Sequence, residues 1–266
     1  MSSLAKRWVL YDPCPEEVYA GLSHLNRIVV QALYNRKVPV AEVEAFLNPP
    51  TMLRDPSQIL DLSVAVARIR AAIAGQEPVV VYGDFDADGV TSTALLVQTL
   101  KAFGAQVTPY IPNRVDEGYG LNCDALDKIA SWGTRLVVTV DCGIRSVREV
   151  EHGNSLGLDM IVTDHHSIQQ DADGHDILPP ALAVINTKRQ GDPYPFKDLA
   201  GVGLAFKLAQ GLMRAEQADP IAPGPVNLKT GDLLDLVALG TVADVAPLLE
   251  ENRALVRLGL NALNRP

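Results

Sequence analysis

The hydrophobic pattern of the first part of the chain has a helical period. Residues 40–47 form a short amphipathic run, which Asn48-Pro49-Pro50 ends because the residue before a proline disfavours helical backbone. Asp61 has the chemistry of an N-cap for a second helix that stops at Gly75. We therefore expect residues 1–77 to form a small N-terminal helical cap region.

From Pro78 onward, short apolar runs rich in β-branched residues alternate with helical patterns. The runs expected to form strands are 79–82, 106–111, 136–140, 160–162 and 182–185, and helices are expected at 91–103 and 124–132. Strands separated by single helices predict a parallel sheet with right-handed crossovers. The predicted fold is therefore α/β, a Rossmann-like and mainly parallel sheet flanked by helices.

The pattern becomes mostly helical after Asp198, which predicts a helical C-terminal portion over 204–214, 233–242 and 252–263. Together with the sheet it forms the second expected domain, residues 78–266.

Composition narrows the class of protein without changing this architecture. The 266 residues are 47% hydrophobic and 21% charged, values that are ordinary for a soluble domain. No apolar run approaches the roughly 20 residues that span a bilayer, and the first residues lack a secretory signal pattern. The 3 cysteines have no short spacing that would suggest disulfides or a zinc site. These features predict a cytoplasmic protein with no membrane partner.

The net charge of −9 argues against a protein that holds nucleic acid by charge alone. It has two interpretations. The acidic residues keep the surface soluble, or several carboxylates converge on divalent cations, whose charge would invert the local field. The positions of the carboxylates must decide.

Three predicted strands are followed directly by segments that contain Asp or His side chains. The first runs into the segment 83–89, Gly-Asp-Phe-Asp-Ala-Asp-Gly, the third into Asp141-Cys142-Gly143, and the fourth into Thr163-Asp164-His165-His166. Functional groups of open parallel sheets gather at the carboxyl ends of the strands. One acidic strand end is commonplace, but three in one sheet predict a site.

Asp84, Asp86 and Asp88 are alternate residues, so in an extended segment their carboxylates would point the same way. Their mutual repulsion would be relieved by a hard divalent cation such as Mg²⁺ or Mn²⁺. A calcium loop of the EF-hand type is excluded, because Leu95 occupies the position at which that loop needs a glutamate.

The adjacent histidines His165 and His166 leave a predicted buried strand directly after Asp164. Imidazole is a suitable ligand for Mn²⁺, iron or zinc, and a neighbouring carboxylate can fix its tautomer. A further carboxylate, Asp244, ends a strongly apolar helix, where the helix dipole disfavours negative charge. Either Asp244 is exposed to solvent, or a cation stabilises it.

With these four segments assembled, the sequence resembles the DHH phosphoesterase superfamily, and within it the RecJ exonucleases. Further shared motifs are Pro112-Asn113-Arg114, Glu117-Gly118-Tyr119-Gly120-Leu121 and Leu199-Ala200-Gly201-Val202-Gly203. The resemblance implies 5′-to-3′ hydrolysis of single-stranded DNA in DNA repair and recombination. The implied partners are single-stranded DNA and repair proteins such as a helicase or a single-strand-binding protein.

The resemblance also implies roles for individual residues around two Mn²⁺ or Mg²⁺ ions. Asp84 and Asp86 would bind one ion, and Asp88, His165 and Asp244 the other, with Asp141 bridging both. His166 would face the scissile phosphate, and Asp164 would support the histidine pair. Asn113 and Arg114 are candidates for contacts to substrate phosphate, although Arg114 could equally form a surface salt bridge. Cys142 could be a nucleophile by position, but we interpret it as a packing residue.

RecJ enzymes continue into a second α/β domain and an oligonucleotide-binding barrel, and we expect both to be absent from this chain. Strand polarity and tight DNA binding are therefore in doubt for this chain alone, and a catalytically weak fragment is one alternative. A second alternative is an enzyme of the same superfamily that acts on pyrophosphate, short oligonucleotides or cyclic dinucleotides. Pyrophosphatases of the superfamily have a histidine at the position of Tyr82, which favours the exonuclease interpretation.

Overall fold

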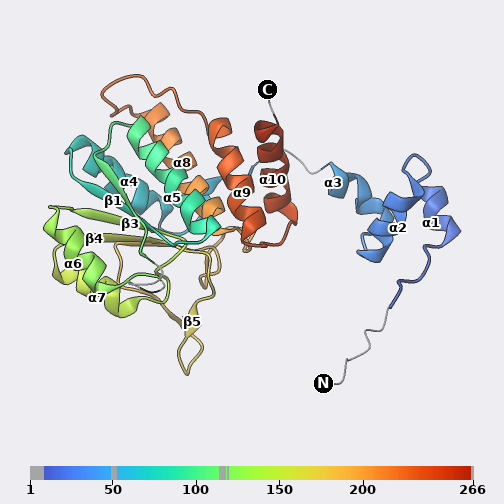
Figure 1. Cartoon of the computed structure of the whole chain (residues 1–266), viewed down its shortest axis with the longest axis horizontal. Helices are drawn as coiled ribbons and strands as arrows, with labels where there is room; N and C mark the ends of the chain where they lie inside the picture. The colour runs from blue at the N-terminus through green and yellow to red at the C-terminus, as the bar shows by residue number, and fades with distance from the viewer. Residues whose placement is uncertain (1–8, 49–52, 114–117, 119, 265–266) are drawn as a thin grey trace. The chain divides into compact units, whose positions relative to one another are not determined.

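The computed structural model describes residues 9–48, 53–113, 118 and 120–264 and divides the chain into two compact units, Met1–Pro50 and Thr51–Pro266 (Figure 1). The first unit contains α1 (Glu16–Gly21), α2 (Arg27–Asn35), the 3-10 turn η1 (Val40–Glu42) and α3 (Val43–Leu47). Its small core consists of Cys14, Leu22, Val30, Leu33 and Val43. The predicted short helix before Asn48 is confirmed, whereas Pro49 and Pro50 lie outside the described residues.

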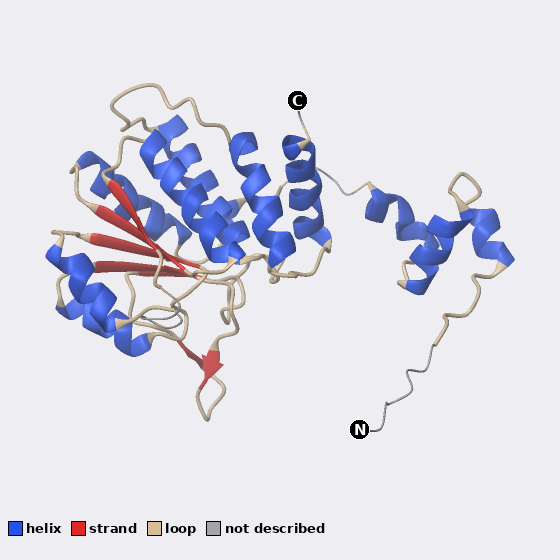
Figure 2. Cartoon of the chain, in the orientation of Figure 1, coloured by secondary structure: helices blue, strands red, loops and turns tan. Residues whose placement is uncertain are grey.

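The second unit is built on a five-stranded parallel sheet (Figure 2). Its strands are β1 (Val79–Gly83), β2 (Val107–Tyr110), β3 (Leu136–Val140), β4 (Asp159–Thr163) and β7 (Ala183–Ile185), in the spatial order β2-β1-β3-β4-β7. Every neighbouring pair is parallel, so the predicted strands and the α/β fold class are confirmed.

Helices cover both faces of this sheet, which explains why its central strands are apolar at successive positions. In β1, Val79 and Val81 pack on the face covered by α4 (Leu62–Ala74), α5 (Ala87–Ala102) and α8 (Gly201–Ala218). Val80 and Tyr82 pack on the opposite face, against α6 (Cys123–Ser131) and α7 (Val147–Ser155). All five residues of β1 and all five of β3 are buried.

The predicted helical C-terminal portion is also confirmed. It consists of α8, the 3-10 turn η3 (Thr230–Leu233), α9 (Leu234–Ala243) and α10 (Glu250–Leu263). Helix α9 packs against α5, α8 and α10 (Figure 1). This packing brings the end of α9 close to the beginning of α5.

Helix α4 belongs to the sheet-containing unit, because it packs against α8 in the main core. The division between the units therefore falls earlier in the chain than residue 77. Asp61 precedes α4 as predicted, but its carboxylate accepts from the Val184 amide (3.1 Å) and from Arg189 (2.6 Å) instead of capping the helix. Gly75 has an ordinary negative φ of −80°, and the left-handed residue at this end is Gln76.

A two-residue antiparallel pair, β5 (Gln169–Gln170) with β6 (Asp176–Ile177), was not expected from the sequence. Its strands are short and polar, so they lack an apolar pattern. The turn between them is held by Asp171, whose Oδ1 accepts from the amides of Asp173 (2.9 Å) and His175 (2.8 Å). Among the described residues, no helix is both long and apolar enough to cross a membrane.

Candidate metal centre

The order of the sheet brings the three chemically unusual strand ends together. Strands β1, β3 and β4 are neighbours and run in the same direction, so Asp84, Asp141 and the segment 164–166 leave the same edge. Asp84, Asp141 and Asp164 are all buried, at 0%, 1% and 2% exposure. Buried carboxylates at one sheet edge are costly unless something neutralises them.

The expectation that Asp84, Asp86 and Asp88 alternate along an extended segment is wrong. Helix α5 begins at Ala87, so Asp88 lies in its first turn, and Asp86 is its N-cap. The carboxylate of Asp86 accepts from the Gly89 amide at 2.9 Å. The N-cap bond satisfies an amide that the helix itself leaves without a partner, which explains why the helix begins here. Asp86 and Asp88 consequently belong to different clusters.

Potential ligand atoms gather in three overlapping groups, in each of which the atoms lie within 4.8 Å of one another. The groups are Asp84, Asp86 and Asp141; Asp88, His165 and Asp244; and Asp141, His165 and His166. Asp141 connects the first group to the histidines. All six residues predicted as metal ligands therefore converge, although they come from four separate segments of the chain.

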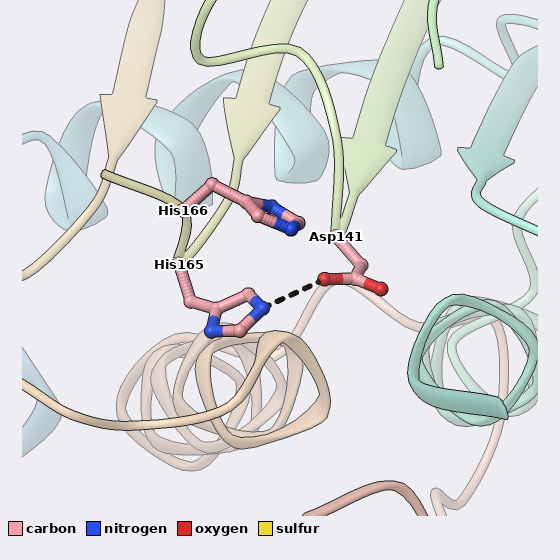
Figure 3. Close-up of side chains that lie close together, drawn as sticks. All are labelled: Asp141, His165 and His166. Atoms are coloured by element: carbon pink, nitrogen blue, oxygen red, sulfur yellow. Dashed lines mark ion pairs between the residues drawn. The ribbon is translucent and has the colours of Figure 1, made fainter. Parts of the chain in front are cut away.

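Asp141 is a strongly perturbed carboxyl group in this cluster. Burial, together with the charges of Asp88 and Asp86, raises the pKa of Asp141 to about 10. Neither of its oxygens has a hydrogen-bond partner among the described residues. His165 Nε2 lies 3.1 Å from Asp141 Oδ1 (Figure 3), but without the alignment of a hydrogen bond. The backbone of Asp141 is left-handed, with φ 61°, a conformation that Asp tolerates better than most residues.

Asp88 is buried, but both of its oxygens have partners. Oδ2 accepts from the Gly201 amide at 2.7 Å, and Oδ1 accepts from the Val202 amide at 2.8 Å. Burial raises the pKa of Asp88 to about 6, although these two hydrogen bonds act in the opposite direction. Burial also lowers the pKa of His165, so this ring is neutral at physiological pH and suited to bind a metal.

His166 is fixed by Asp164. The Asp164 Oδ1 atom lies 2.7 Å from His166 Nδ1 and also accepts from the His166 amide at 3.0 Å. Its Oδ2 accepts from the Ile144 amide at 2.9 Å. The hydrogen bond to Asp164 raises the pKa of His166 to about 9. Burial alone would raise the pKa of Asp164, but the bonds and charge of His166 and the Ile144 amide outweigh it and lower that pKa.

The structure places Asp244 beside other candidate ligands. It is the C-cap of α9, and its side chain is 23% exposed, so it is not simply a solvated carboxylate. Its Oδ1 lies 3.9 Å from His165 Nε2, within the group that contains Asp88. Negative charge at a helix C-terminus is unfavourable, which is the situation that a bound cation relieves.

The remaining candidates lie outside these groups. Cys142 is buried, its Sγ lies 3.8 Å from the Tyr82 carbonyl oxygen, and burial raises its thiol pKa well above the ordinary value. It is therefore a packing residue. Asn113 is exposed beyond the end of β2. Arg114 lies outside the described residues.

The donor set fits divalent cations with a preference for oxygen ligands. Carboxylates dominate it, a neutral imidazole is present, and Asp141 presents two buried oxygens that lack hydrogen-bond partners in the described part of the chain. Mg²⁺ and Mn²⁺ prefer such ligands, whereas a structural zinc site would use Cys and His.

Comparison with known proteins agrees with this geometry. Residues 78–241 match the DHH family, N-terminal domain. The chain belongs to the DHH family.

Its sequence is also similar to those of curated proteins. It is 41% identical to the single-stranded-DNA-specific exonuclease RecJ of Bacillus subtilis over 263 residues, which cover 97% of this chain and 31% of that protein. It is 45% identical to RecJ of Escherichia coli over 189 residues, 70% of this chain and 32% of that protein. The chain thus spans about a third of the length of the curated relatives that it matches.

Solved structures are similar as well. A crystal structure of exonuclease RecJ bound to manganese matches with a TM-score of 0.64 and 37% identity, over 76% of this chain and 48% of that one. RecJ in complex with Mn²⁺ from Thermus thermophilus matches with a TM-score of 0.67 and 32% identity, over 92% of this chain and 32% of that one. These similarities agree with the α/β architecture described above.

The sequence did not predict which groups hold the carboxylates of Asp88 and Asp164 in place. The amides of Gly201, Val202 and Ile144 bind Asp88 and Asp164, but a backbone donor leaves no signal in residue type. A partial signal was present in the segment 199–203, whose two glycines were noted without a role.

Proposed function

We propose that this chain carries a metal-dependent phosphoesterase core that hydrolyses phosphodiester bonds in single-stranded DNA. The observation that carries the proposal is the position of Asp141. It is buried between two groups of potential ligands, and both of its oxygens lack hydrogen-bond partners within the described chain. A carboxylate in this position can bridge two cations.

The ligands divide into two sets. Asp84 and Asp86 would hold one Mn²⁺ or Mg²⁺ ion with Asp141, and Asp88, His165 and Asp244 would hold the other, also with Asp141. The side-chain clusters support this division, because Asp141 lies in one group with Asp84 and Asp86, and His165 links Asp141 to the group of Asp88 and Asp244. When bound, two such cations supply an activated water and stabilise the oxygens of an in-line displacement at phosphorus.

Protein groups would bind and orient the substrate phosphate. His166 keeps its proton at neutral pH because Asp164 raises its pKa to about 9. Since Nδ1 is engaged by Asp164 at 2.7 Å, Nε2 is left to donate to a phosphate oxygen. His166 thereby offers a positive charge and a hydrogen-bond donor beside Asp141. Asn113 and Arg114 are proposed to contact phosphates further along the strand.

The identity of the substrate rests on the relatives. The RecJ proteins at 41% and 45% identity are described as single-stranded-DNA-specific exonucleases. By this likeness we place the chain in DNA repair and recombination in the cytoplasm, with 5′-to-3′ polarity and with a helicase or single-strand-binding protein as partner. Because the family match begins at residue 78, we propose residues 1–77 as the helical cap region and residues 78–266 as the phosphoesterase region, with α4 of the cap region packed in the core of the phosphoesterase region.

The alternative of a pyrophosphatase is disfavoured by Tyr82. Its side chain is 0% exposed, and its hydroxyl donates to the Gly120 carbonyl at 2.9 Å. Its ring stacks on Tyr110, with centroids 5.2 Å apart. Tyr82 is therefore a structural residue on the face of the sheet that carries α6 and α7, and it does not occupy a ligand position.

A nuclease assay tests the proposal. The purified chain is incubated with 5′-phosphorylated, 3′-labelled single-stranded DNA, first with Mn²⁺ and then with EDTA, and Asp141→Asn serves as the contamination control. Asparagine is preferable to alanine because it tolerates the left-handed backbone of Asp141. Manganese-dependent release of mononucleotides that the variant lacks would support the proposal. Hydrolysis of pyrophosphate with no attack on DNA would reverse it.

A further inference from the structure

The first turn of α8 lies directly against the candidate ligands. The amides of Gly201 and Val202 donate to the two oxygens of Asp88, at 2.7 Å and 2.8 Å. These bonds join residues that are 113 and 114 positions apart in the chain. Because the two donors are backbone groups at the beginning of a helix, they fix both the position and the rotation of the Asp88 carboxylate.

Gly201 also touches the other central carboxylate. A Cβ atom added to Gly201 would lie 2.6 Å from Asp141 Oδ1 and 2.8 Å from Asp141 Cγ, closer than real Cβ contacts come. The φ angle of Gly201 is not in the left-handed region, so its backbone conformation does not require glycine. Glycine is required because a side chain at this position would collide with Asp141.

We propose that Gly201 is a positioning residue for the metal centre, setting the distance between Asp88 and Asp141. Its amide holds Asp88, and its missing side chain lets Asp141 approach the same turn of helix. Asp88 belongs to one ligand group and Asp141 would be shared by both ions, so Gly201 controls how closely the shared carboxylate approaches the group of Asp88. This inference rests on the proposed two-cation function, but it concerns a residue to which that function gives no part.

Gly240 of α9 supports the same interpretation from another direction. A Cβ atom at Gly240 would lie 2.9 Å from Asp88 Oδ1 and 2.3 Å from Thr91 Oγ1. Both α8 and α9 therefore approach Asp88 closely at a glycine. Gly203, two residues after Gly201, differs: its added Cβ would meet only the Leu199 side chain, at 3.3 Å, and no site residue. Gly203 is thus a matched control on the same helix.

The test compares Gly201→Ala with Gly203→Ala in manganese binding, measured by calorimetry and by electron paramagnetic resonance. Changes in groups that orient metal ligands typically cost about 10- to 100-fold in metal affinity. We expect Gly201→Ala to lose at least about tenfold in affinity for one ion, and Gly203→Ala to stay within about twofold. Circular dichroism and thermal unfolding in EDTA verify that both variants fold.

A readout without metal separates this inference from the proposed function. In EDTA, the ring resonances of His165 should shift in Gly201→Ala, because Asp141 lies 3.1 Å from that ring, and should stay in place in Gly203→Ala. Wild-type protein that binds no manganese would overturn the proposed function alone. Normal manganese affinity together with unshifted His165 resonances in Gly201→Ala would overturn the positioning role alone.

A further measurement needs no substitution at residue 201, in case that variant does not fold. The amide protons of Gly201 and Val202 are followed by NMR in wild-type protein and in Asp88→Ala, both in EDTA. Loss of the carboxylate should move these two amide resonances far more than that of Gly203. Equal, small shifts at all three amides would contradict the contact on which the inference depends.

Discussion

The imidazole of His166 and the carboxylate of Asp164 form an ion pair, with Nδ1 and Oδ1 2.7 Å apart. Asp164 is 2% exposed and sits behind the ring, whereas the His166 side chain is 39% exposed. The pair therefore presents a protonated ring at the surface and keeps its counter-charge in the interior. This arrangement makes the charge of His166 dependent on one buried neighbour.

Replacing Asp164 by asparagine should lower the pKa of His166 from about 9 towards the ordinary value of 6.5. The ion pair stabilises the fold fully below pH 6.5, and this contribution is lost as the pH rises through about 9. An NMR titration of the His166 ring in EDTA measures the change. An unaltered His166 pKa in the variant would mean that Asp164 is not its main partner.

Replacing Asp141 by asparagine should stabilise the metal-free protein at alkaline pH. With a folded pKa near 10 and an ordinary value of 3.8, folded Asp141 keeps a proton that the unfolded chain releases. Stability therefore falls as the pH rises from about 4 to 10, and the neutral asparagine escapes this loss. In EDTA, the Tm advantage of the variant should grow from pH 5.5 to 8.5, by about 2–4 °C for each kcal/mol. A constant difference across this range would contradict the burial of a proton on Asp141.

Manganese binding should release protons. Asp141 has to lose its proton before it can act as a ligand, so the affinity should rise with pH up to about 10. Calorimetry at pH 7.5 in two buffers of different ionisation enthalpy measures the protons released. We expect about one for the wild type and fewer for Asp141→Asn. Equal release by both proteins would assign the proton to another group.

Lys207 of α8 belongs to none of the candidate ligand groups, and we expect it to stabilise the fold. Its ammonium lies 2.6 Å from Glu251 Oε1, with side-chain exposures of 0% and 3%, and Glu251 also accepts from the Tyr194 hydroxyl at 2.5 Å. Lys207→Met would leave the Glu251 charge buried without its cation, which costs about 3–5 kcal/mol. Urea unfolding measures this loss in the free energy of unfolding.

Two further variants complete that test. Lys207→Met combined with Glu251→Gln should recover part of the stability, because the remaining buried group is then neutral. Arg214→Met is the surface control on the same helix: the side chains of Arg214 and its partner Asp55 are 52% and 50% exposed, so their ion pair should contribute at most about 1 kcal/mol. A loss for Lys207→Met no larger than for Arg214→Met would show that the buried pair is dispensable.

The sheet was predictable from the sequence because its signal is local. The valine-rich runs at 79–82 and 136–140 are buried on both faces of the sheet, so every position in them is apolar or nearly so and the run is visible in the sequence. The beginning of α5 was placed too late, at residue 91 instead of Ala87. The acidic residues before Gly89 were taken for an extended loop, whereas Asp86 caps the helix and Asp88 lies inside it.

The convergence of the candidate ligands was predictable from the sequence, but the groups that support them were not. Three strand ends had to meet, because parallel neighbours end at one edge of the sheet. The support of Asp88 could not be foreseen, since it depends on how α8 packs more than one hundred residues later along the chain. The same limit applies to Asp61, which is an N-cap by position but binds Arg189 instead.

The candidate ligands connect separate elements of the fold, because they follow β1, β3, β4 and α9 along the chain. A cation shared between Asp88, His165 and Asp244 would act as a reversible cross-link that fastens the end of α9 to the sheet. Closing such long stretches of chain restricts the unfolded state, so the cross-link would resist opening most strongly at the C-terminal helices. Removal of the cation by a chelator should therefore increase the protease sensitivity of α9 and α10 first, before that of the sheet.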